Sequence, residues 1–221
     1  MLNTDSSHLL DSGLGLVFVD ASIDDAQALM GGIVDRWSNN QMLFVSIDAE
    51  SDGIQKITET LAQYDSSFIS AIHIISHGES GSLQLGNTVL DSNTLASYSD
   101  DLLGWRDSLT EEADLLFYGC NVAAGSTGQD FVNQIAYWTG ADVVASSDLT
   151  GSRLLGGDAD LEYATGAIEA SIILDADLLN QYGGVFLIGE ATGTGNLFTF
   201  EESDWGVESP LIIDGLGGID K

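Results

Sequence analysis

The alternation of apolar runs with helix-like segments constrains the fold of this chain more than any other feature. Five runs are apolar almost throughout and have the length of strands, at residues 14–22, 41–49, 68–76, 113–119 and 141–147. Segments with apolar residues three and four positions apart lie between them, at 23–37, 52–64, 91–105 and 128–140. Continuous apolar runs are typical of strands covered on both faces, and their alternation with helices indicates parallel pairing.

The predicted fold class is therefore α/β, a three-layer α/β/α sandwich with a mostly parallel sheet and right-handed crossovers. Ser22 is an expected N-cap, with Asp25 at the capping-box spacing, and Gly140 is an expected C-cap. Residues 81–90 alternate around Gly86-Asn87, which predicts a small hairpin.

The α/β domain is expected to span residues 14–175. Hydrophobic residues make up 44% of the 221 residues, which is enough for one domain with a sizeable core. Residues 176–221 are rich in glycine and acidic residues and are only weakly periodic. They are expected to form a linker or the start of a following domain.

Acidic residues outnumber basic residues by 35 to 5, which gives a formal net charge of -30. Such a surface repels phosphate backbones and anionic lipids, so neither nucleic acid nor a membrane surface is an expected partner. It suits a high-salt or calcium-rich medium, or it simply keeps the protein soluble. Calcium is a possible ligand, but no acidic segment has EF-hand spacing, so no metal site is assigned.

Two further classes of segment are not expected. No apolar run reaches the length of a membrane span, so membrane insertion is not predicted. The N-terminal residues lack a basic region followed by an apolar one, so a cleaved signal peptide is not predicted in this chain. A single cysteine rules out an internal disulfide.

Two of the apolar runs end in reactive side chains. The stretch HIISHG ends on His77-Gly78, and LLFYGCN ends on Cys120-Asn121. Cys120 is the only cysteine of the chain. Ligands of an open parallel sheet bind beyond the carboxyl ends of its strands, so neighbouring strands would bring His77 and Cys120 to one rim. A histidine beside a thiol favours the thiolate and can later protonate a leaving amine.

The backbone N–H groups of Gly78 and Cys120 are the candidate oxyanion hole of this site, and Gly119 permits a sharp exit from the strand. A lone cysteine or histidine is more often structural, and it is their joint placement at two strand ends that favours a site. His73, in mid-strand between two isoleucines, is expected to be a core histidine or to support the site.

At these residues the sequence resembles the caspase-like (clan CD) cysteine peptidases, in which an apolar strand ending in His-Gly precedes one ending in Cys. The separation of 43 positions from His77 to Cys120 is similar to the roughly 50 of caspases. Across residues 14–172, the stretches around His77, Cys120 and Ser147 resemble an uncharacterised caspase-like domain. That domain occurs near one end of giant bacterial surface adhesins and calcium-binding repeat proteins. The caspase segment Gln-Ala-Cys-x-Gly is replaced here by FYGCNVAAG.

The resemblance implies a caspase-hemoglobinase fold and a His77/Cys120 dyad that needs no cofactor. It implies a peptidase whose substrate is a polypeptide, its own chain included, at an extracellular or cell-surface location. Ser146, Ser147 and Asp148 then line the expected pocket for the side chain before the cleaved bond. A carboxylate in that pocket would select Arg or Lys. Arg153 is the candidate internal target, or else the partner that neutralises Asp148.

Two alternatives to a self-processing cysteine endopeptidase remain from the sequence. The domain could be a catalytically silent structural or binding module of an adhesin. It could also be another doubly wound enzyme, although the sequence contains no Gly-x-Ser-x-Gly, Walker A or dinucleotide motif. A solvent-accessible thiol with a lowered pKa would favour the peptidase, and a buried thiol facing away from His77 would favour the module.

Overall fold

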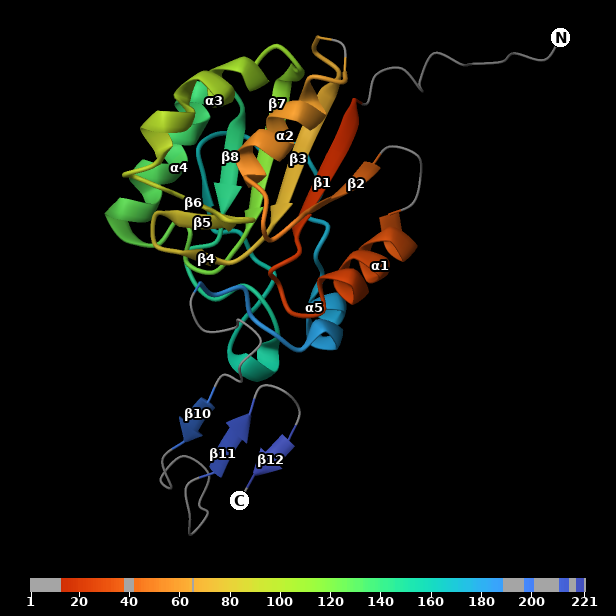
Figure 1. Cartoon of the computed structure of the whole chain (residues 1–221), viewed down its shortest axis with the longest axis vertical. Helices are drawn as coiled ribbons and strands as arrows, with labels where there is room; N and C mark the ends of the chain where they lie inside the picture. The colour runs from red at the N-terminus through yellow and green to blue at the C-terminus, as the bar shows by residue number, and fades with distance from the viewer. Residues whose placement is uncertain are drawn as a thin grey trace, which may run out of the picture.

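A six-stranded sheet in the order β2-β1-β3-β7-β8-β9 forms the centre of the molecule (Figure 1). The computed structural model describes residues 13–37, 42–64 and 66–188, and three short strands at 197–200, 211–214 and 218–220. The sheet contains β1 (Leu14–Asp20), β2 (Met42–Ile47), β3 (Ile69–Ile75), β7 (Leu109–Tyr118), β8 (Asp142–Ala145) and β9 (Tyr163–Ala164). The first five are parallel, and the short edge strand β9 is antiparallel to β8. The predicted α/β class with a mostly parallel sheet is confirmed.

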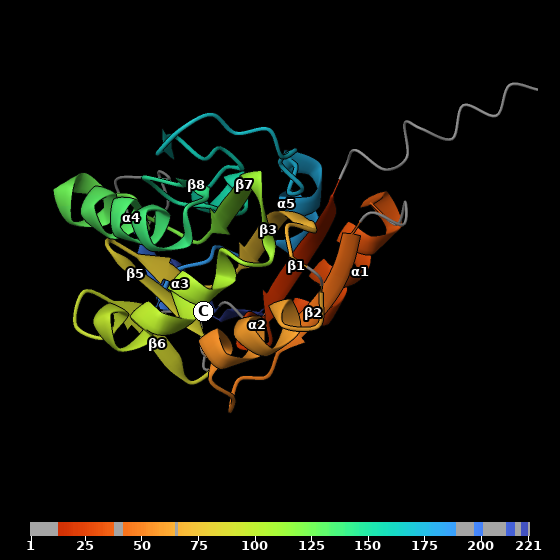
Figure 2. The ribbon, with the colours of Figure 1, turned by 90° about the horizontal axis from the view of Figure 1, so that it is seen from above.

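Helices cover both faces of this sheet (Figure 2). One face carries α2 (Gly53–Leu61), α3 (Ser99–Trp105) and α4 (Gly125–Thr139), and the other carries α1 (Ala26–Trp37) and α5 (Ala176–Tyr182). Successive strand residues point to opposite faces, so each strand supplies both layers. Burial of each large apolar side chain contributes about 1.5–3 kcal/mol to stability.

The layer beneath α1 and α5 is important for the site, and we call it the α1/α5 cluster. Its buried members are Val17, Val19, Ile23, Leu29, Ile33, Ala71, Ile75, Leu116, Tyr118, Cys120, Val144, Ile173, Leu174, Leu178, Leu179, Val185 and Phe186. Cys120 is therefore packed within an apolar layer, together with four residues from the predicted linker, Leu178, Leu179, Val185 and Phe186.

The connection between β1 and α1 differs from the prediction. The helix begins at Ala26, and Ser22 does not cap it. Instead, the Asp20 carboxylate accepts a hydrogen bond from the Ser22 N–H at 2.8 Å, and Asp25 has a φ of 53°. The aspartate that ends β1 thus stabilises a turn at the position where the sequence predicts the first helical turn.

The segment 91–105 is also not a single helix. Asp91 Oδ1 accepts from the backbone N–H groups of Asn93 and Thr94 and holds a turn. A 3-10 helix, η2 (Leu95–Tyr98), then leads into α3. A second 3-10 helix, η3 (Arg153–Leu155), lies in the segment after β8.

The predicted hairpin is present, with β5 (Ser82–Leu85) and β6 (Thr88–Asp91) paired around Gly86-Asn87. A short strand, β4 (Gly78–Glu79), adds to its edge. Gly86 has a φ of 61°, and its N–H donates to the Asp20 carboxylate at 2.6 Å. This contact ties the hairpin to the carboxyl end of β1.

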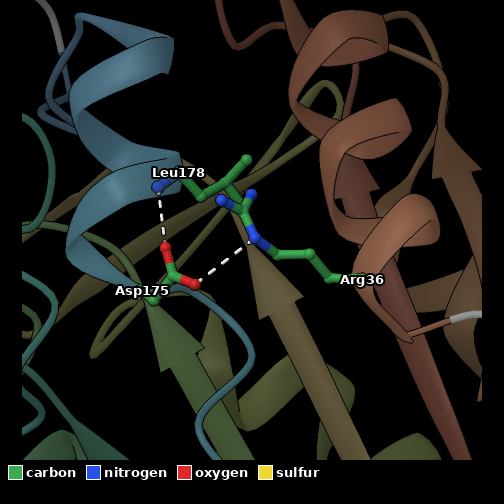
Figure 3. A network of polar contacts seen from close by, with 3 residues as sticks. All are labelled: Arg36, Asp175 and Leu178. Atoms are coloured by element: carbon green, nitrogen blue, oxygen red, sulfur yellow. Dashed lines mark hydrogen bonds and ion pairs between the residues drawn. The ribbon is translucent and has the colours of Figure 1, made fainter.

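The packed unit continues past the predicted boundary at Asp175. Asp175 caps α5 by accepting from the Leu178 N–H at 2.7 Å, and its other oxygen lies 3.4 Å from Nε of Arg36 in α1 (Figure 3). Leu178 and Leu179 are buried against the sheet. Residues 176–188 therefore pack with the α/β unit and do not form a linker.

Three further strands lie in the remainder of the predicted linker: β10 (Leu197–Phe200), β11 (Leu211–Asp214) and β12 (Gly218–Asp220). They pair antiparallel. The rest of residues 189–221 lies outside the described residues. Among the helices that are described, none combines the length and the apolarity needed to cross a membrane.

Candidate active site

His77 and Cys120 extend from two neighbouring parallel strands, β3 and β7. The last paired residues of these strands are Ile75 and Tyr118, and each candidate residue follows two positions later. The Ser76 N–H donates to the Tyr118 carbonyl at 3.3 Å, which continues the pairing. Because side chains alternate along a strand, His77 and Cys120 lie on the face of Ile75 and Tyr118, toward the α1/α5 cluster.

Two backbone N–H groups converge on one carbonyl oxygen beside Cys120. The N–H groups of Gly78 and Cys120 donate to the Phe186 carbonyl at 2.8 and 2.9 Å. These are the two donors that the sequence predicts for an oxyanion hole. A Cβ on Gly78 would lie 2.5 Å from Val122 Cγ2 and 2.9 Å from the Cys120 carbonyl oxygen, so only glycine brings this N–H so close to Cys120.

The Cys120 thiol is fully buried next to the same carbonyl. It donates to the Thr150 carbonyl oxygen at 3.4 Å, and that oxygen also accepts from the Phe186 N–H at 3.0 Å. The thiol therefore lies beside the Phe186 backbone. Burial raises the pKa of Cys120 to about 11, so the thiol is protonated at neutral pH in this closed arrangement.

The His77 ring is nearly as well buried, with 4% of its surface exposed. Neither ring nitrogen has a hydrogen-bond partner in the described part of the chain, and no hydrogen bond joins it to Cys120. Burial lowers the pKa of His77. This effect is larger than the opposite effect of the nearby Ser22 backbone and of the Asp20 and Asp24 carboxylates, which favour the protonated ring. A neutral imidazole with a free nitrogen can accept a proton from a thiol.

A single segment, residues 184–188, covers the site and holds the Phe186 carbonyl in position. On one side, the Ser152 N–H donates to the Gly184 carbonyl at 2.8 Å. On the other side, the Ile188 N–H donates to the Gly78 carbonyl at 3.1 Å. The sequence gives no signal for this segment, because all of these contacts involve the backbone.

Two other residues at this edge were not identified from the sequence. Asn121, directly after Cys120, has a φ of 58°, which is uncommon for a residue other than glycine and recurs at functional sites. Its N–H donates to the Asp148 carbonyl at 2.6 Å, which fixes the turn after Cys120. Asp20 is fully buried at the end of β1. The rule that selected His77, a polar residue that ends an apolar run, also applies to Asp20.

The three predicted pocket residues follow β8. Ser146 is buried and its hydroxyl bonds to the Asp148 carbonyl, whereas Ser147 and Asp148 are exposed. The Ser147 N–H donates to the Glu162 carboxylate at 2.7 Å. Among the described residues, no hydrogen bond joins these three side chains to residues 184–188.

Arg153 does not neutralise Asp148, contrary to one of the two expectations. It is exposed in η3, and the ion pair found among the described residues joins Arg36 to Asp175. Asp148 lies instead with Asp158 and Glu162, their carboxylate oxygens within 4.8 Å of one another. Its pKa is raised, by burial first and then by those carboxylates. Exposed acidic groups gather in this way without a metal, and no metal site is assigned to them.

His73 lies deeper in the same layer. Its Nδ1 is 3.2 Å from the Tyr118 hydroxyl, which also accepts from the Ile173 N–H at 3.1 Å. The hydroxyl therefore donates to His73, whose other nitrogen is without a partner in the described residues. A cavity of about 640 Å³ at the amino ends of the strands includes His73 in its lining, at the opposite edge of the sheet from Cys120.

A comparison with protein families gives one result. A family model described as "Domain of unknown function (DUF4347)" matches residues 16–186, more than half of the chain. The chain belongs to this family. The match includes His77, Gly78 and Cys120, and it ends at Phe186, the residue whose carbonyl lies in the candidate oxyanion hole. No curated protein matches the chain. The DUF4347 description names no activity, so the chemistry is inferred from the site itself.

Proposed function

We propose that this DUF4347 domain is a cysteine endopeptidase with a His77/Cys120 dyad and a caspase-hemoglobinase-like fold, and that it processes its own polypeptide. One observation supports this function above all others. The N–H groups of Gly78 and Cys120 hold a peptide carbonyl at 2.8 and 2.9 Å next to the only thiol of the chain. An oxyanion hole requires two such donors near 2.7–3.1 Å from the developing charge.

The roles of the residues follow from this arrangement. His77, on the neighbouring strand, takes the thiol proton, and Cys120 attacks the carbonyl carbon. The two N–H groups then stabilise the oxyanion, and His77 returns the proton to the leaving amine. The reaction needs no cofactor; any role of calcium would lie outside the dyad. From the resemblance, the domain is proposed to act at an extracellular or cell-surface location, as part of a large bacterial adhesin.

The second candidate function, a catalytically silent module of an adhesin, has a specific observation in its favour. Cys120 is fully buried with a pKa of about 11, and neither nitrogen of His77 is hydrogen-bonded within the described residues. We attribute this closed state to residues 184–188, which cover the site. The two functions therefore differ in what happens when this segment is displaced.

Hydrolysis of short fluorogenic peptides tests the proposed function. The panel carries Phe, Leu, Asp, Arg or Lys before the cleaved bond. It is offered to the wild-type chain and to Phe186→Ser, whose small side chain weakens the hold of the covering segment. We expect hydrolysis by Phe186→Ser, and a decrease of at least tenfold when His77→Ala or Cys120→Ala is added, because both groups act on the bond.

His73→Gln is the matched control for His77→Ala, because His73 is a second buried histidine that lies away from the Phe186 carbonyl. It is expected to retain activity. Absence of peptide hydrolysis in both the wild-type chain and Phe186→Ser, together with no Cys120-dependent cut of the chain itself, would reject the peptidase in favour of the silent module. Equal hydrolysis after Cys120→Ala would also reject it. Cleavage after Arg or Lys alone would support the Asp148 pocket.

A further inference from the structure

We propose that residues 184–188 are the substrate of this site and that the bond cleaved is Phe186–Leu187. The inference rests on the proposed function and specifies its substrate. The Phe186 carbonyl is the group that accepts both N–H donors, so it is the carbonyl that Cys120 would attack. Arg153, the internal target expected from the sequence, lies in η3, and its carbonyl accepts from the Gly156 N–H.

Backbone hydrogen bonds hold the chain on both sides of this bond. Before it, residues 184–186 pair antiparallel with residues 150–152, through Ser152 N–H to Gly184 O at 2.8 Å and Phe186 N–H to Thr150 O at 3.0 Å. After it, Leu187 bridges Gly78 in parallel, and the Ile188 N–H donates to the Gly78 carbonyl at 3.1 Å. An extended peptide fixed on both sides of one carbonyl is the pose that positions a substrate for attack.

Close approach of this peptide depends on Gly151. It has a φ of 143°, and a Cβ there would overlap the Gly184 carbonyl oxygen and lie 2.7 Å from the Val185 Cα. The backbone of residues 150–152 can therefore lie directly against another backbone. It recognises the extended form of the chain, and the specificity of the site must come mainly from the Phe186 side chain.

The surroundings of the Phe186 side chain are apolar. The side chain is 0% exposed, belongs to the α1/α5 cluster with Tyr118 and Cys120, and its ring centroid lies 5.1 Å from that of Tyr182. A buried apolar pocket binds a large apolar side chain and excludes a charged one, because an unpaired buried charge is costly. The substrate class is thus a large apolar residue at the cleaved bond. This differs from the Arg or Lys expected from Asp148.

The reaction balances with water as the one co-reactant. His77 takes the proton of the Cys120 thiol as sulfur bonds to the Phe186 carbonyl carbon. The carbon–nitrogen bond to Leu187 then breaks, and its nitrogen receives the proton from His77, which leaves a thioester between Phe186 and Cys120. Water, deprotonated by His77, hydrolyses the thioester and restores the thiol. The products are a carboxylate at Phe186 and an amine at Leu187.

Cleavage would separate the DUF4347 domain from the chain that follows. The family match ends at residue 186, so the new C-terminus would coincide with the end of the matched region. Once the covalent link is broken, residues 187 and 188 are held by their contacts with Gly78 and by the packing of Leu187 against the α1/α5 cluster, and these non-covalent contacts can be lost. Departure of residues 187 and 188 would open the side of the site beyond the cleaved bond, while residues 184–186 stay joined to the domain and paired with residues 150–152.

The test is the intact mass of the purified full chain, followed over time with and without added calcium. We expect two fragments that meet at Phe186–Leu187, formed at a rate independent of protein concentration, because each chain carries its own substrate. Cys120→Ala should remain intact. Phe186→Ser should be cut at least tenfold more slowly, because the apolar pocket loses its occupant. Arg153→Gln should be cut like the wild-type chain.

Gly151→Ala provides a second variant, which keeps the sequence of residues 184–188 but displaces their backbone, so it should also slow the cut. A chain that stays intact while Cys120-dependent peptide hydrolysis is observed would overturn this inference and make residues 184–188 an inhibitory segment, with the proposed function intact. A cut that maps after Arg153 or within residues 189–221 would also overturn it. Loss of both activities would reject the proposed function as well.

Discussion

Replacing Asp20 with alanine is expected to lower the free energy of unfolding by about 3 kcal/mol, because one buried and one partly buried backbone donor would each lose their acceptor. The carboxylate is fully buried and accepts from the Ser22 N–H at 2.8 Å and the Gly86 N–H at 2.6 Å. It joins the end of β1 to the hairpin whose first strand pairs with Gly78. Urea unfolding followed by tryptophan fluorescence measures the change.

Asp48→Ala is the matched control for this experiment. Asp48 also accepts from the N–H two residues later, that of Glu50 at 2.9 Å, but it is exposed to water. Its loss should cost less than about 1 kcal/mol, since water can replace the carboxylate. Equal unfolding midpoints for the two variants would show that Asp20 does not hold this edge of the sheet together.

The pH dependence of stability should contain a large contribution from His73. Burial lowers its pKa from 6.5 to about 4 in the folded chain, so the unfolded chain binds the proton more strongly. Above pH 6.5 this group does not reduce the free energy of unfolding. As the pH falls toward 4 the free energy of unfolding decreases, because the unfolded chain binds a proton that the folded chain does not. Since one pKa unit corresponds to about 1.4 kcal/mol, the loss amounts to about 3 kcal/mol.

Comparison with His73→Gln isolates this contribution, because glutamine does not titrate and its carbonyl oxygen can still accept from the Tyr118 hydroxyl. The many carboxylates of the chain titrate in both proteins, so only the difference between the two pH profiles is informative. We expect the wild-type chain to lose stability relative to His73→Gln between pH 6.5 and 4. Parallel profiles over that range would contradict the assignment.

The main features of the fold could be predicted because they arise from patterns of side chains. Apolar runs such as 68–76 and 113–119 specify strands, and their helical neighbours specify parallel pairing. The placement of His77 and Cys120 at one edge follows from that topology. The end of the domain was predicted too early, because α5 is only seven residues long and follows a stretch with little regular structure.

The contact that carries the proposal could not be predicted. Phe186 lies 66 residues after Cys120, and its carbonyl meets the Gly78 and Cys120 N–H groups without any side-chain pattern that marks the pairing. Backbone hydrogen bonds between distant segments leave no periodic signal in a sequence. Asp20 is the opposite case. Like His77, it is a polar residue at the end of an apolar run, so the sequence could have identified it.

His77 should lower the pKa of the Cys120 thiol when residues 184–188 are displaced, in addition to taking the thiol proton when Cys120 attacks the covering segment itself. Alkylation of Cys120 by iodoacetamide as a function of pH measures that pKa, because Cys120 is the only cysteine and every labelled thiol belongs to the site. In the intact wild-type chain, in which residues 184–188 cover the site, the alkylation rate should increase until the pH approaches about 11. In the open form Phe186→Ser, the rate should instead reach its plateau below the ordinary thiol value of about 8.5.

Adding His77→Ala to the open form should return the thiol pKa read from the pH profile to about 8.5, because the neighbouring imidazole is lost. Adding His73→Gln should leave the profile of the open form unchanged. We expect the Cys120 thiol to become more acidic on opening, and this change to depend on His77. An open form that titrates at or above 8.5, with the same profile after His77→Ala, would contradict it.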